Sequence, residues 1–351
     1  MGIQPSILKA FDELGRFLSG FVSQSGSGND KWSIQLNEAI ATARNHNAWF
    51  TRDNILFALG QWGGLLTEKK LIDWFSIYDI NANNDEKTVA IIMAGNIPLV
   101  GFHDFICALL TGHRLIAKPS SNDKILLPFI ADYLMAKDTS LKSRIRFTND
   151  RLDGFDAVIA TGSNNTGRYF EHYFGQHPNI IRKNRNSVGV LTGQETKEEL
   201  ENLGKDIFTY FGLGCRSLSK VFVPNDYDFH SFFEAIYSFK DIINNHKYAN
   251  NYDYNKAVYL MSDFKILDNN FLLLKQDDAN ASPIGTLFYE TYDTLDTVTN
   301  KLDEAKEQLQ CVVSNGVVPN SIAFGQTQQP KLTDYADNID TVRFLLSLNR
   351  Q

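Results

Sequence analysis

Residues 88–120 read TVAIIMAGNIPLVGFHDFICALLTGHRLIAKPS, and this stretch decides the expected fold. Its opening run, 88–93, is short, apolar and rich in β-forming residues, which indicates a strand. Apolar residues then recur at helical spacing over 99–112, just after Pro98, a residue that suits a first helical turn. Another strand-like run follows at 114–120. A strand, a helix and a strand in this order predict a parallel sheet wrapped by helices.

The same alternation continues along the chain in both directions from this stretch. Downstream, the pattern predicts a helix at 123–137, a strand at 155–163 and a helix at 164–175. A second run of alternating elements begins near Ser187, and it covers 187–193, 197–212, 220–224, 229–243, 257–261, 285–292, 294–309 and 310–316. Upstream, apolar residues at roughly helical spacing predict helices at 6–21, 31–44, 52–64 and 67–78.

Length and composition limit the classes of protein that the chain can belong to. A chain of 351 residues exceeds the usual size of a single core, so two domains are expected, with a break near 186–196. The formal charge of -7 provides no basic field for nucleic acid. The N-terminal sequence lacks a signal-peptide pattern and no apolar run approaches membrane-spanning length, so we expect no integral membrane segment.

The three cysteines are Cys107, Cys215 and Cys311, which lie far apart in the sequence. An odd number of distant cysteines argues against a disulfide framework and against a closely spaced metal site, so no metal is expected. This usage fits a reducing compartment, and a cytoplasmic protein is the prediction. Cys107, on an apolar helical stretch, and Cys311, in a strand-like run, are interpreted as small buried hydrophobic residues.

Two segments of the opening stretch end in polar residues that could act on a ligand. Asn96 follows the first strand, and its amide could donate to a developing oxyanion, although asparagine is also a common helix cap. Lys118 and Ser120 end the next strand, where the lysine could meet the ribose or phosphate of a nucleotide. A lysine at such a place is also commonly just solvated.

Two further segments lie downstream. A glycine-bounded turn from Gly162 to Gly167 joins a strand to a helix, and its backbone N–H groups could hold a pyrophosphate, although such turns often bind nothing. Cys215 lies in the glycine-rich junction GLGCRS, where nearby cations and N–H groups would favour a reactive thiolate. A lone cysteine is also often a buried hydrophobic residue.

The order and spacing of these four segments resemble the aldehyde dehydrogenase superfamily. Its pattern is Asn-x-Pro after a strand, Lys-Pro-Ser, a Gly-Ser-x-x-x-Gly turn, and then a cysteine after a glycine-rich loop. Within that superfamily, GNIPLVGFHDF, KPSSNDK, NRNSVGVL and GLGCRSLSKVFVP look most like the acyl-CoA reductase family typified by the fatty-acid reductase of bacterial luminescence. The resemblance covers roughly residues 85–325.

The resemblance implies an aldehyde dehydrogenase-like α/β fold. It would comprise N-terminal helices with a Rossmann-like cofactor domain over 1–190, a catalytic α/β domain with Cys215 over 191–325, and a terminal segment of unassigned role over 326–351. Cys215 would be the nucleophile and Asn96 the oxyanion donor. The remaining carried-over residues would bind the cofactor, namely Lys118, Ser120, Gly162, Ser163 and Gly167.

The resemblance also implies partners and a reaction. NADPH would be the usual reductant, with NADH as the alternative, and the substrate would be acyl-CoA or another acyl thioester. A homodimer is an expectation taken from the superfamily. The hydrolytic members carry a Glu-Leu-Gly-Gly-Lys run, whereas this chain has RKNRNSVGV there, and Glu171 is the one carboxylate between Arg168 and Gly193. Without a positioned base the thioester should resist water and wait for hydride.

Two other functions fit the same residues. An acyl-phosphate reductase of the same superfamily would keep the fold and change the activated acyl group. A non-redox protein would use Cys215 only to carry an acyl group between thiols, since fold alone does not decide function. The basic residues Arg182, Lys183, Arg185 and Arg216 are either phosphate contacts or a solvated stretch. Aromatic candidates for an acyl pocket are Phe102, Tyr169, Phe170 and Phe174.

Overall fold

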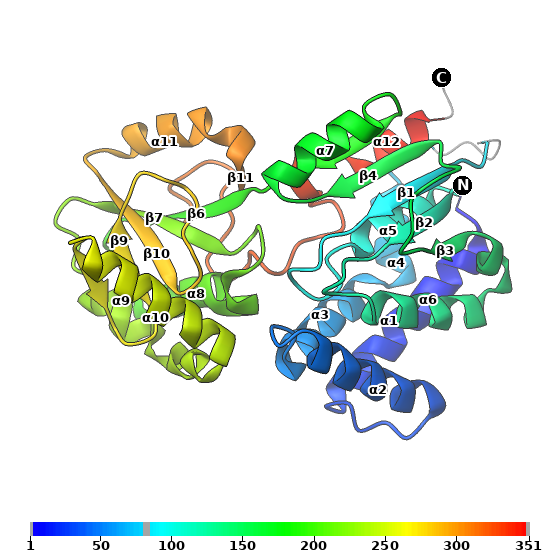
Figure 1. Cartoon of the computed structure of the whole chain (residues 1–351), viewed down its shortest axis with the longest axis horizontal. Helices are drawn as coiled ribbons and strands as arrows, with labels where there is room; N and C mark the ends of the chain where they lie inside the picture. Colours follow the sequence, from blue (N-terminus) through cyan, green and yellow to red (C-terminus); the bar gives the residue numbers. More distant parts are fainter. Residues whose placement is uncertain (1–2, 80–84, 349–351) are drawn as a thin grey trace. The chain divides into compact units, whose positions relative to one another are not determined.

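The computed structural model describes residues 3–79 and 85–348. The chain forms two compact units, of which unit 1 is Met1–Lys183 with Lys331–Gln351 and unit 2 is Asn184–Pro330 (Figure 1). The first division falls after residue 183 rather than after residue 190, because the strand between these positions pairs with strands of unit 2. Over the described ranges, no helix is long and apolar enough to cross a membrane.

The described part of unit 1 contains a five-stranded sheet in the order β3-β2-β1-β4-β5. All four pairings in this sheet are parallel. Because β1 pairs with β2 on one side and β4 on the other, the strand order reverses at β1, as in doubly wound α/β folds. The strands are β1 Thr88–Ile92, β2 Arg114–Lys118, β3 Ile145–Phe147, β4 Ala157–Thr161 and β5 Asn179–Arg182.

Helices cover both faces of this sheet. On one face, Val89 and Ile91 of β1 share a core with Phe105 of α5. On the other face, Ala90 packs in a smaller core with Phe170 of α7. The helices are α5 Phe102–Leu110, α6 Leu126–Lys137 and α7 Asn164–Phe174, with the 3-10 turn η1 Thr139–Ser143 after α6. Consecutive residues of β1 therefore enter two different cores, as the pleat of a doubly covered strand requires.

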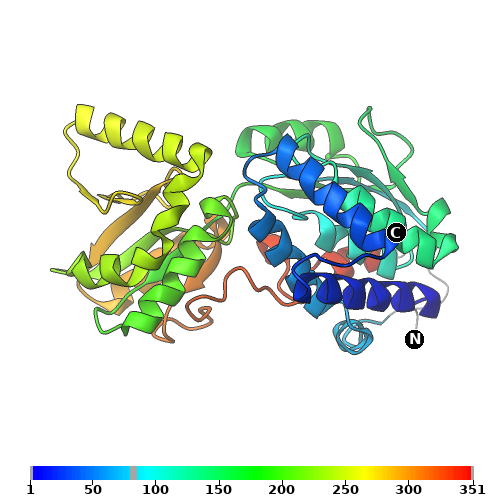
Figure 2. The ribbon, with the colours of Figure 1, turned by 90° about the horizontal axis from the view of Figure 1, so that it is seen from below.

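The N-terminal helices expected from the apolar spacing are present, and they belong to unit 1. Figure 2 shows these blue helices on the near side of the unit. Asp30, Thr51 and Thr67 cap the second, third and fourth by accepting hydrogen bonds from first-turn N–H groups. Their buried faces enter the same core as α5. The helices are α1 Pro5–Ser23, α2 Lys31–His46, α3 Arg52–Leu65 and α4 Glu68–Phe75.

The end of the chain returns to unit 1. Its elements are η5 Ala336–Asn338 and α12 Thr341–Ser347. Val342 and Leu345 are fully buried in the core that contains α5. The indole N–H of Trp74 also donates to the hydroxyl of Tyr335 at 2.8 Å. Most of the terminal segment is therefore part of the first core.

The described part of unit 2 contains a six-stranded sheet in the order β11-β6-β7-β10-β9-β8. Every pairing is parallel except β8 with β9. The strands are β6 Asn186–Val190, β7 Leu218–Pro224, β8 Ile266–Asp268, β9 Leu273–Gln276, β10 Thr286–Tyr292 and β11 Leu309–Val313. The helices and 3-10 turns are α8 Lys197–Phe208, η2 Thr209–Gly212, α9 Phe229–Ala235, η3 Ile236–Asn244, α10 His246–Met261, α11 Leu295–Glu304 and η4 Lys306–Gln308. The expected parallel α/β organisation holds in both units.

Candidate active site

Three of the predicted segments meet at one edge of the unit 1 sheet. Asn96 follows β1, Lys118 ends β2, and Gly162 follows β4. Ile92 at the end of β1 is in register with Lys118 on one side and Ala160 on the other, so all three segments leave the sheet at its carboxyl edge. In open α/β sheets, ligands bind at this edge, where the strand order reverses.

Gly95 and Ser120 show how closely two of these segments pack. A Cβ added to Gly95 would lie 2.6 Å from the side chain of Ser120 and 3.1 Å from the backbone nitrogen of Asp123. Glycine is therefore required at position 95 to let the segment after β1 approach the segment after β2. Ser120 is half-buried, whereas Asn96 beside this contact is exposed.

The turn that carries Asn96 differs from the expected helix start. α5 begins at Phe102, later than the start near Pro98 that the sequence predicted, because Leu99 has a φ of 59° and interrupts the helix. The backbone N–H of Leu99 donates to Asp123 Oδ2 at 2.9 Å. Burial raises the pKa of Asp123 to about 6, although the backbone hydrogen bonds that its carboxylate accepts lower it. A buried carboxylate thus holds the turn.

We expect Asp123 to make the stability of unit 1 depend on pH. Because the pKa of Asp123 is raised from 3.8 to about 6, its contribution to the free energy of unfolding is fully present in acid and is lost as pH rises through about 6. Between about pH 4 and about pH 8, the free energy of unfolding of the wild type should fall by at most about 3 kcal/mol relative to that of Asp123→Asn, whose side chain stays neutral. Urea titrations of both proteins at the two pH values measure this difference. Identical pH dependence in both would contradict the assignment.

The glycine-bounded segment after β4 has two separate parts. Gly162 lies just before α7, where an added Cβ would be 3.0 Å from both Thr166 and Phe170. Ser163 caps the helix, since its Oγ accepts from the N–H of Thr166 at 3.2 Å. Gly167 lies one turn inside α7 and packs on the stem of Lys183, 3.0 Å from an added Cβ. Helix N-termini attract phosphates, so the start of α7 is the part suited to an anion.

A cavity of about 750 Å³ opens beside this edge of the sheet. Two cations line it, Lys118 and Arg151, and Lys118 Nζ donates to the carbonyl oxygen of Asp150 at 2.8 Å. The sequence did not predict a role for Arg151, because the strand that precedes it, β3, is too short to be recognised. The other lining residues are apolar or aromatic: Ile92, Leu152, Phe155, Tyr169, Phe170, Tyr173, Phe174 and His177. Phe102, by contrast, is fully buried in the core.

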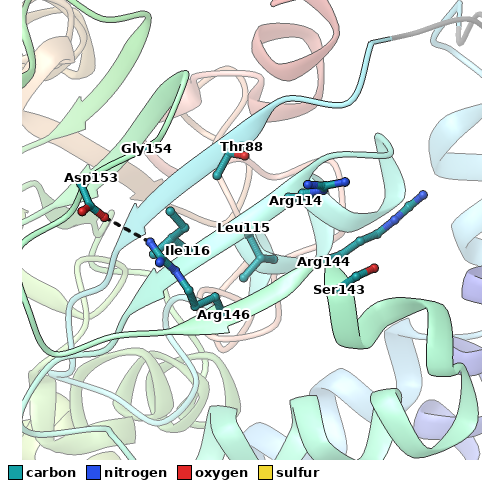
Figure 3. A pocket seen from close by; sticks show the side chains of 9 residues that line it. All are labelled: Thr88, Arg114, Leu115, Ile116, Ser143, Arg144, Arg146, Asp153 and Gly154. Carbon is teal, nitrogen blue, oxygen red and sulfur yellow. Dashed lines mark hydrogen bonds and ion pairs between the residues drawn. The ribbon is translucent and has the colours of Figure 1, made fainter.

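A smaller cavity of about 400 Å³ lies at the opposite ends of the strands (Figure 3). Three arginines surround it, yet carboxylates already pair with each of them. Glu86 binds Arg114 at 2.7 Å and Arg144 at 3.2 Å, and Asp153 binds Arg146 at 3.4 Å. This cavity is therefore not part of the candidate site.

The basic stretch after β5 is largely committed to protein contacts. Arg182 is 3% exposed and forms a bidentate ion pair with Asp104, at 2.5 and 2.9 Å, so it cannot meet a phosphate. Lys183 pairs with Glu171 at 2.7 Å. Glu171 lies in the second half of α7, and the pairing engages one oxygen of its carboxylate. The phosphate role considered for Arg182 is therefore wrong.

In unit 2, Cys215 is exposed at the tip of a turn, whereas Cys107 and Cys311 are buried. The N–H of Ser217 donates to the carbonyl oxygen of Gly214 at 2.9 Å, which closes the turn around the cysteine. Ser187 Oγ donates to the carbonyl oxygen of Cys215 at 2.9 Å. Burial raises the pKa of the Cys107 thiol well above its usual value, so Cys107 is unsuited to act as a nucleophile.

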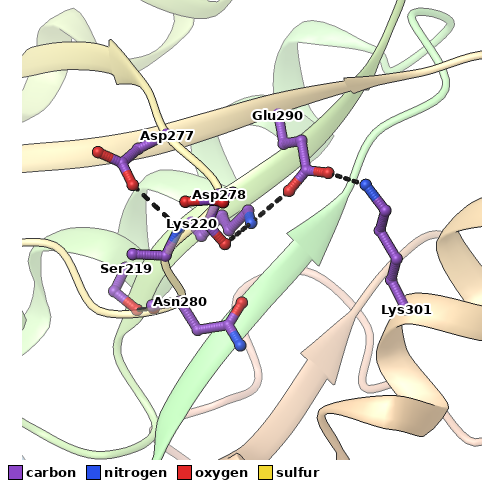
Figure 4. A network of polar contacts seen from close by, with 8 residues as sticks. Ser219, Lys220, Asp277, Asp278, Asn280, Glu290 and Lys301 are labelled. Atoms are coloured by element: carbon purple, nitrogen blue, oxygen red, sulfur yellow. Dashed lines mark hydrogen bonds and ion pairs between the residues drawn. The ribbon is translucent and has the colours of Figure 1, made fainter.

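Polar contacts also fix the strand that follows Cys215 (Figure 4). Ser219 Oγ donates to the carbonyl oxygen of Asn280 at 2.6 Å. Lys220, only 1% exposed at its side chain, binds Glu290 at 2.5 Å and donates to the carbonyl oxygen of Asp278 at 2.7 Å. Lys301 adds a second cation to Glu290. These contacts hold the start of the strand that follows the turn. Lys220 is buried and paired with Glu290, so it is not available to interact with the Cys215 thiol.

Across the described residues, no group of three or more His, Cys, Asp or Glu side chains could hold a metal ion.

Comparison with known proteins agrees with this organisation. An aldehyde dehydrogenase 21 from Physcomitrella patens, in complex with succinate, matches with a TM-score of 0.68 and 11% identity over 98% of this chain and 84% of that chain. An indole-3-acetaldehyde dehydrogenase of P. syringae in complex with NAD+ and IAA matches with a TM-score of 0.59 and 13% identity, over 88% of this chain and 72% of that chain. These likenesses confirm the expected aldehyde dehydrogenase-like fold.

No curated protein matches the sequence. The family model described as acyl-CoA reductase (LuxC), however, matches residues 48–321, which is most of the chain and includes all four predicted segments. The chain therefore belongs to the acyl-CoA reductase (LuxC) family.

Proposed function

We propose that this protein reduces acyl-CoA esters to aldehydes with NADPH, through a thioester on Cys215. The observation that carries the proposal is the turn of unit 2, where Cys215 is the exposed cysteine and neighbouring side chains fix the backbone around it. Nucleophilic cysteines need this combination of access and fixed orientation. Membership of the acyl-CoA reductase family supports the choice of an acyl thioester as substrate.

In the proposed reaction, the Cys215 sulfur attacks the acyl carbonyl carbon and a new C–S bond forms. Asn96 donates a hydrogen bond from its side-chain amide to the carbonyl oxygen, which carries the negative charge. The bond to coenzyme A breaks, and coenzyme A leaves as a thiol that takes up the proton given up by the Cys215 thiol. Bound NADPH would supply a hydride to the acyl carbon, after which the bond to Cys215 breaks and the aldehyde leaves.

The residues at the carboxyl edge of unit 1 fit a dinucleotide. The start of α7, capped by Ser163, offers backbone N–H groups and a positive dipole end for a pyrophosphate. Gly95 and Gly162 let the segments after β1 and β4 pack closely on Ser120 and on Thr166, which fixes the backbone at this edge. The cavity beside Lys118 supplies aromatic faces for a base and cations for phosphate. We assign Lys118, Ser120, Gly162 and Ser163 to cofactor binding, with Gly167 serving the packing of α7.

Steady-state assays with several activated acyl groups test the function. NADPH oxidation should require an acyl-CoA, and an acyl phosphate of the same chain length should support little. Turnover of the acyl phosphate alone would favour the acyl-phosphate reductase. Acyl exchange between thiols without any NADPH oxidation would favour the non-redox transferase.

We expect Arg151 to distinguish NADPH from NADH. It is exposed and lines the same cavity as Lys118, so two cations are available to a 2′-phosphate. Arg151→Ala should weaken binding of 2′,5′-ADP by about tenfold, as loss of about 1.4 kcal/mol, and leave binding of 5′-AMP unchanged. Calorimetry measures both ligands. Arg146→Ala, which removes an exposed arginine paired with Asp153, is the control. Equal losses for both nucleotides would contradict a 2′-phosphate contact.

The proposal also includes a cellular location and an oligomeric state. We also propose a cytoplasmic location, the compartment that the odd number of widely spaced cysteines in the sequence favours. Assembly as a homodimer is carried over from the superfamily, and sedimentation of the purified protein would test it.

A further inference from the structure

Asp206 in α8 is a buried acidic residue with an unusual set of partners. It is 0% exposed, and its carboxylate faces three donors of a distant segment. Oδ2 accepts from the N–H of Gly325 at 2.6 Å, and Oδ1 accepts from the N–H and the hydroxyl of Thr327 at 3.0 and 2.7 Å. A buried carboxylate is costly unless it is well hydrogen-bonded, so these contacts bind the segment firmly to α8.

The segment held by Asp206 in turn holds the residues that follow Cys215. The carbonyl oxygen of Thr327 accepts from Arg216 Nε at 2.6 Å. Gln328 Nε2 donates to Ser217 Oγ at 3.2 Å. Arg216 and Ser217 are the next two residues after Cys215, and Ser217 also closes its turn. A continuous chain of contacts therefore runs from Asp206 to the turn.

The backbone conformation of Gly325 is a second observation that supports a specific contact between this segment and α8. Its φ is +81°, a conformation that residues with side chains rarely adopt, and an added Cβ would be 3.1 Å from Asn202 of α8. The backbone is thus brought against α8 at the point where its N–H reaches Asp206. Asparagine at 206 would not serve as well, because its amide would turn a donor toward one of the N–H groups.

We propose that Asp206 is a positioning residue for Cys215, acting through Thr327 and Arg216. The inference rests on the proposed function, in which Cys215 is the nucleophile. Asp206 touches neither substrate nor cofactor in this scheme. Its role is to hold the turn in the one orientation that presents the sulfur, which matters because small misplacements of a reacting atom cost large factors in rate.

A double-mutant cycle with two readouts tests this role. Asp206→Asn and Arg216→Met should each lower kcat with acyl-CoA by about tenfold or more and leave the KM for NADPH unchanged. Because both variants break one chain of contacts, the double variant should lose no more than the worse single variant. Asp296→Asn, the same change at an exposed first-turn residue of α11, should keep wild-type activity.

Hydrogen exchange provides the readout that does not need turnover. In both single variants, the peptide containing Ser217 should exchange faster, while peptides of β10 keep wild-type protection. Exchange that rises throughout unit 2, or losses in kcat that multiply in the double variant, would overturn the positioning role. If the wild type fails to reduce acyl-CoA, the proposed function fails, and local exchange at Ser217 still tests the connection to Asp206.

Discussion

Replacing Cys215 with alanine should abolish acyl-CoA-dependent oxidation of NADPH, with a loss of about 10⁴-fold or more, on the precedent of other covalent nucleophiles. The loss is expected to be this large because no second thiol can substitute for it. Cys107 is 0% exposed and Cys311 is 5% exposed. Steady-state assays measure the effect, and thermal denaturation should show that the variant remains folded, because the removed side chain lies at the surface.

Cys311→Ala is the matched control for this variant. It makes the same chemical change at a buried position of β11, so it should cost some stability and little activity. If Cys215→Ala retained more than about a tenth of the wild-type rate, the acyl group would not pass through this sulfur. The mechanism would then need another nucleophile or direct hydride transfer to the thioester.

Loss of the buried ion pair in unit 1 should have the largest effect on stability. Arg182→Met would leave the side chain of Asp104, 8% exposed, as a buried charge without its partner. Breaking such a pair costs about 3–5 kcal/mol, which corresponds to a fall in Tm of about 6–20 °C for a unit of this size. Arg182 Nη2 also donates to Thr341 Oγ1 at 2.9 Å, so the loss should loosen α12 as well.

Two further variants separate this explanation from a simple loss of packing. Combining Arg182→Met with Asp104→Leu should recover much of the lost stability, since no buried charge remains. Arg343→Met, at an exposed arginine of α12, should change the free energy of unfolding by no more than about 0.5 kcal/mol. Equal Tm values for Arg182→Met and Arg343→Met would contradict the assigned role of the ion pair.

The elements that could be predicted from sequence were those with a long, regular apolar pattern. β1, α5 and β2 follow from 88–120, and the N-terminal helices follow from their spacing. β3 and β5 were missed because Ile145–Phe147 and Asn179–Arg182 are too short to show a period. The late start of α5 was also missed, because the positive φ belongs to Leu99, a residue type that gives no sign of it.

The residues of the candidate site also differ in how far they could be predicted from the sequence. Asn96, Lys118 and Gly162 could be placed together because the ends of parallel strands meet at one edge. The exposure of Cys215 was indicated by the glycines around it. The buried pairing of Arg182 and the contacts of Asp206 could not be predicted, because their partners lie 78 residues away at Asp104 and 121 residues away at Thr327. Contacts between such distant residues leave no local pattern.

The most direct test of the account is intact-protein mass spectrometry of the enzyme mixed with acyl-CoA in the absence of reductant. We predict an increase in mass by one acyl group, located on the peptide that contains Cys215, and its disappearance with release of aldehyde when NADPH is added. Aldehyde formation from acyl-CoA and NADPH without any such adduct, or an adduct that NADPH does not discharge, would contradict the proposed mechanism.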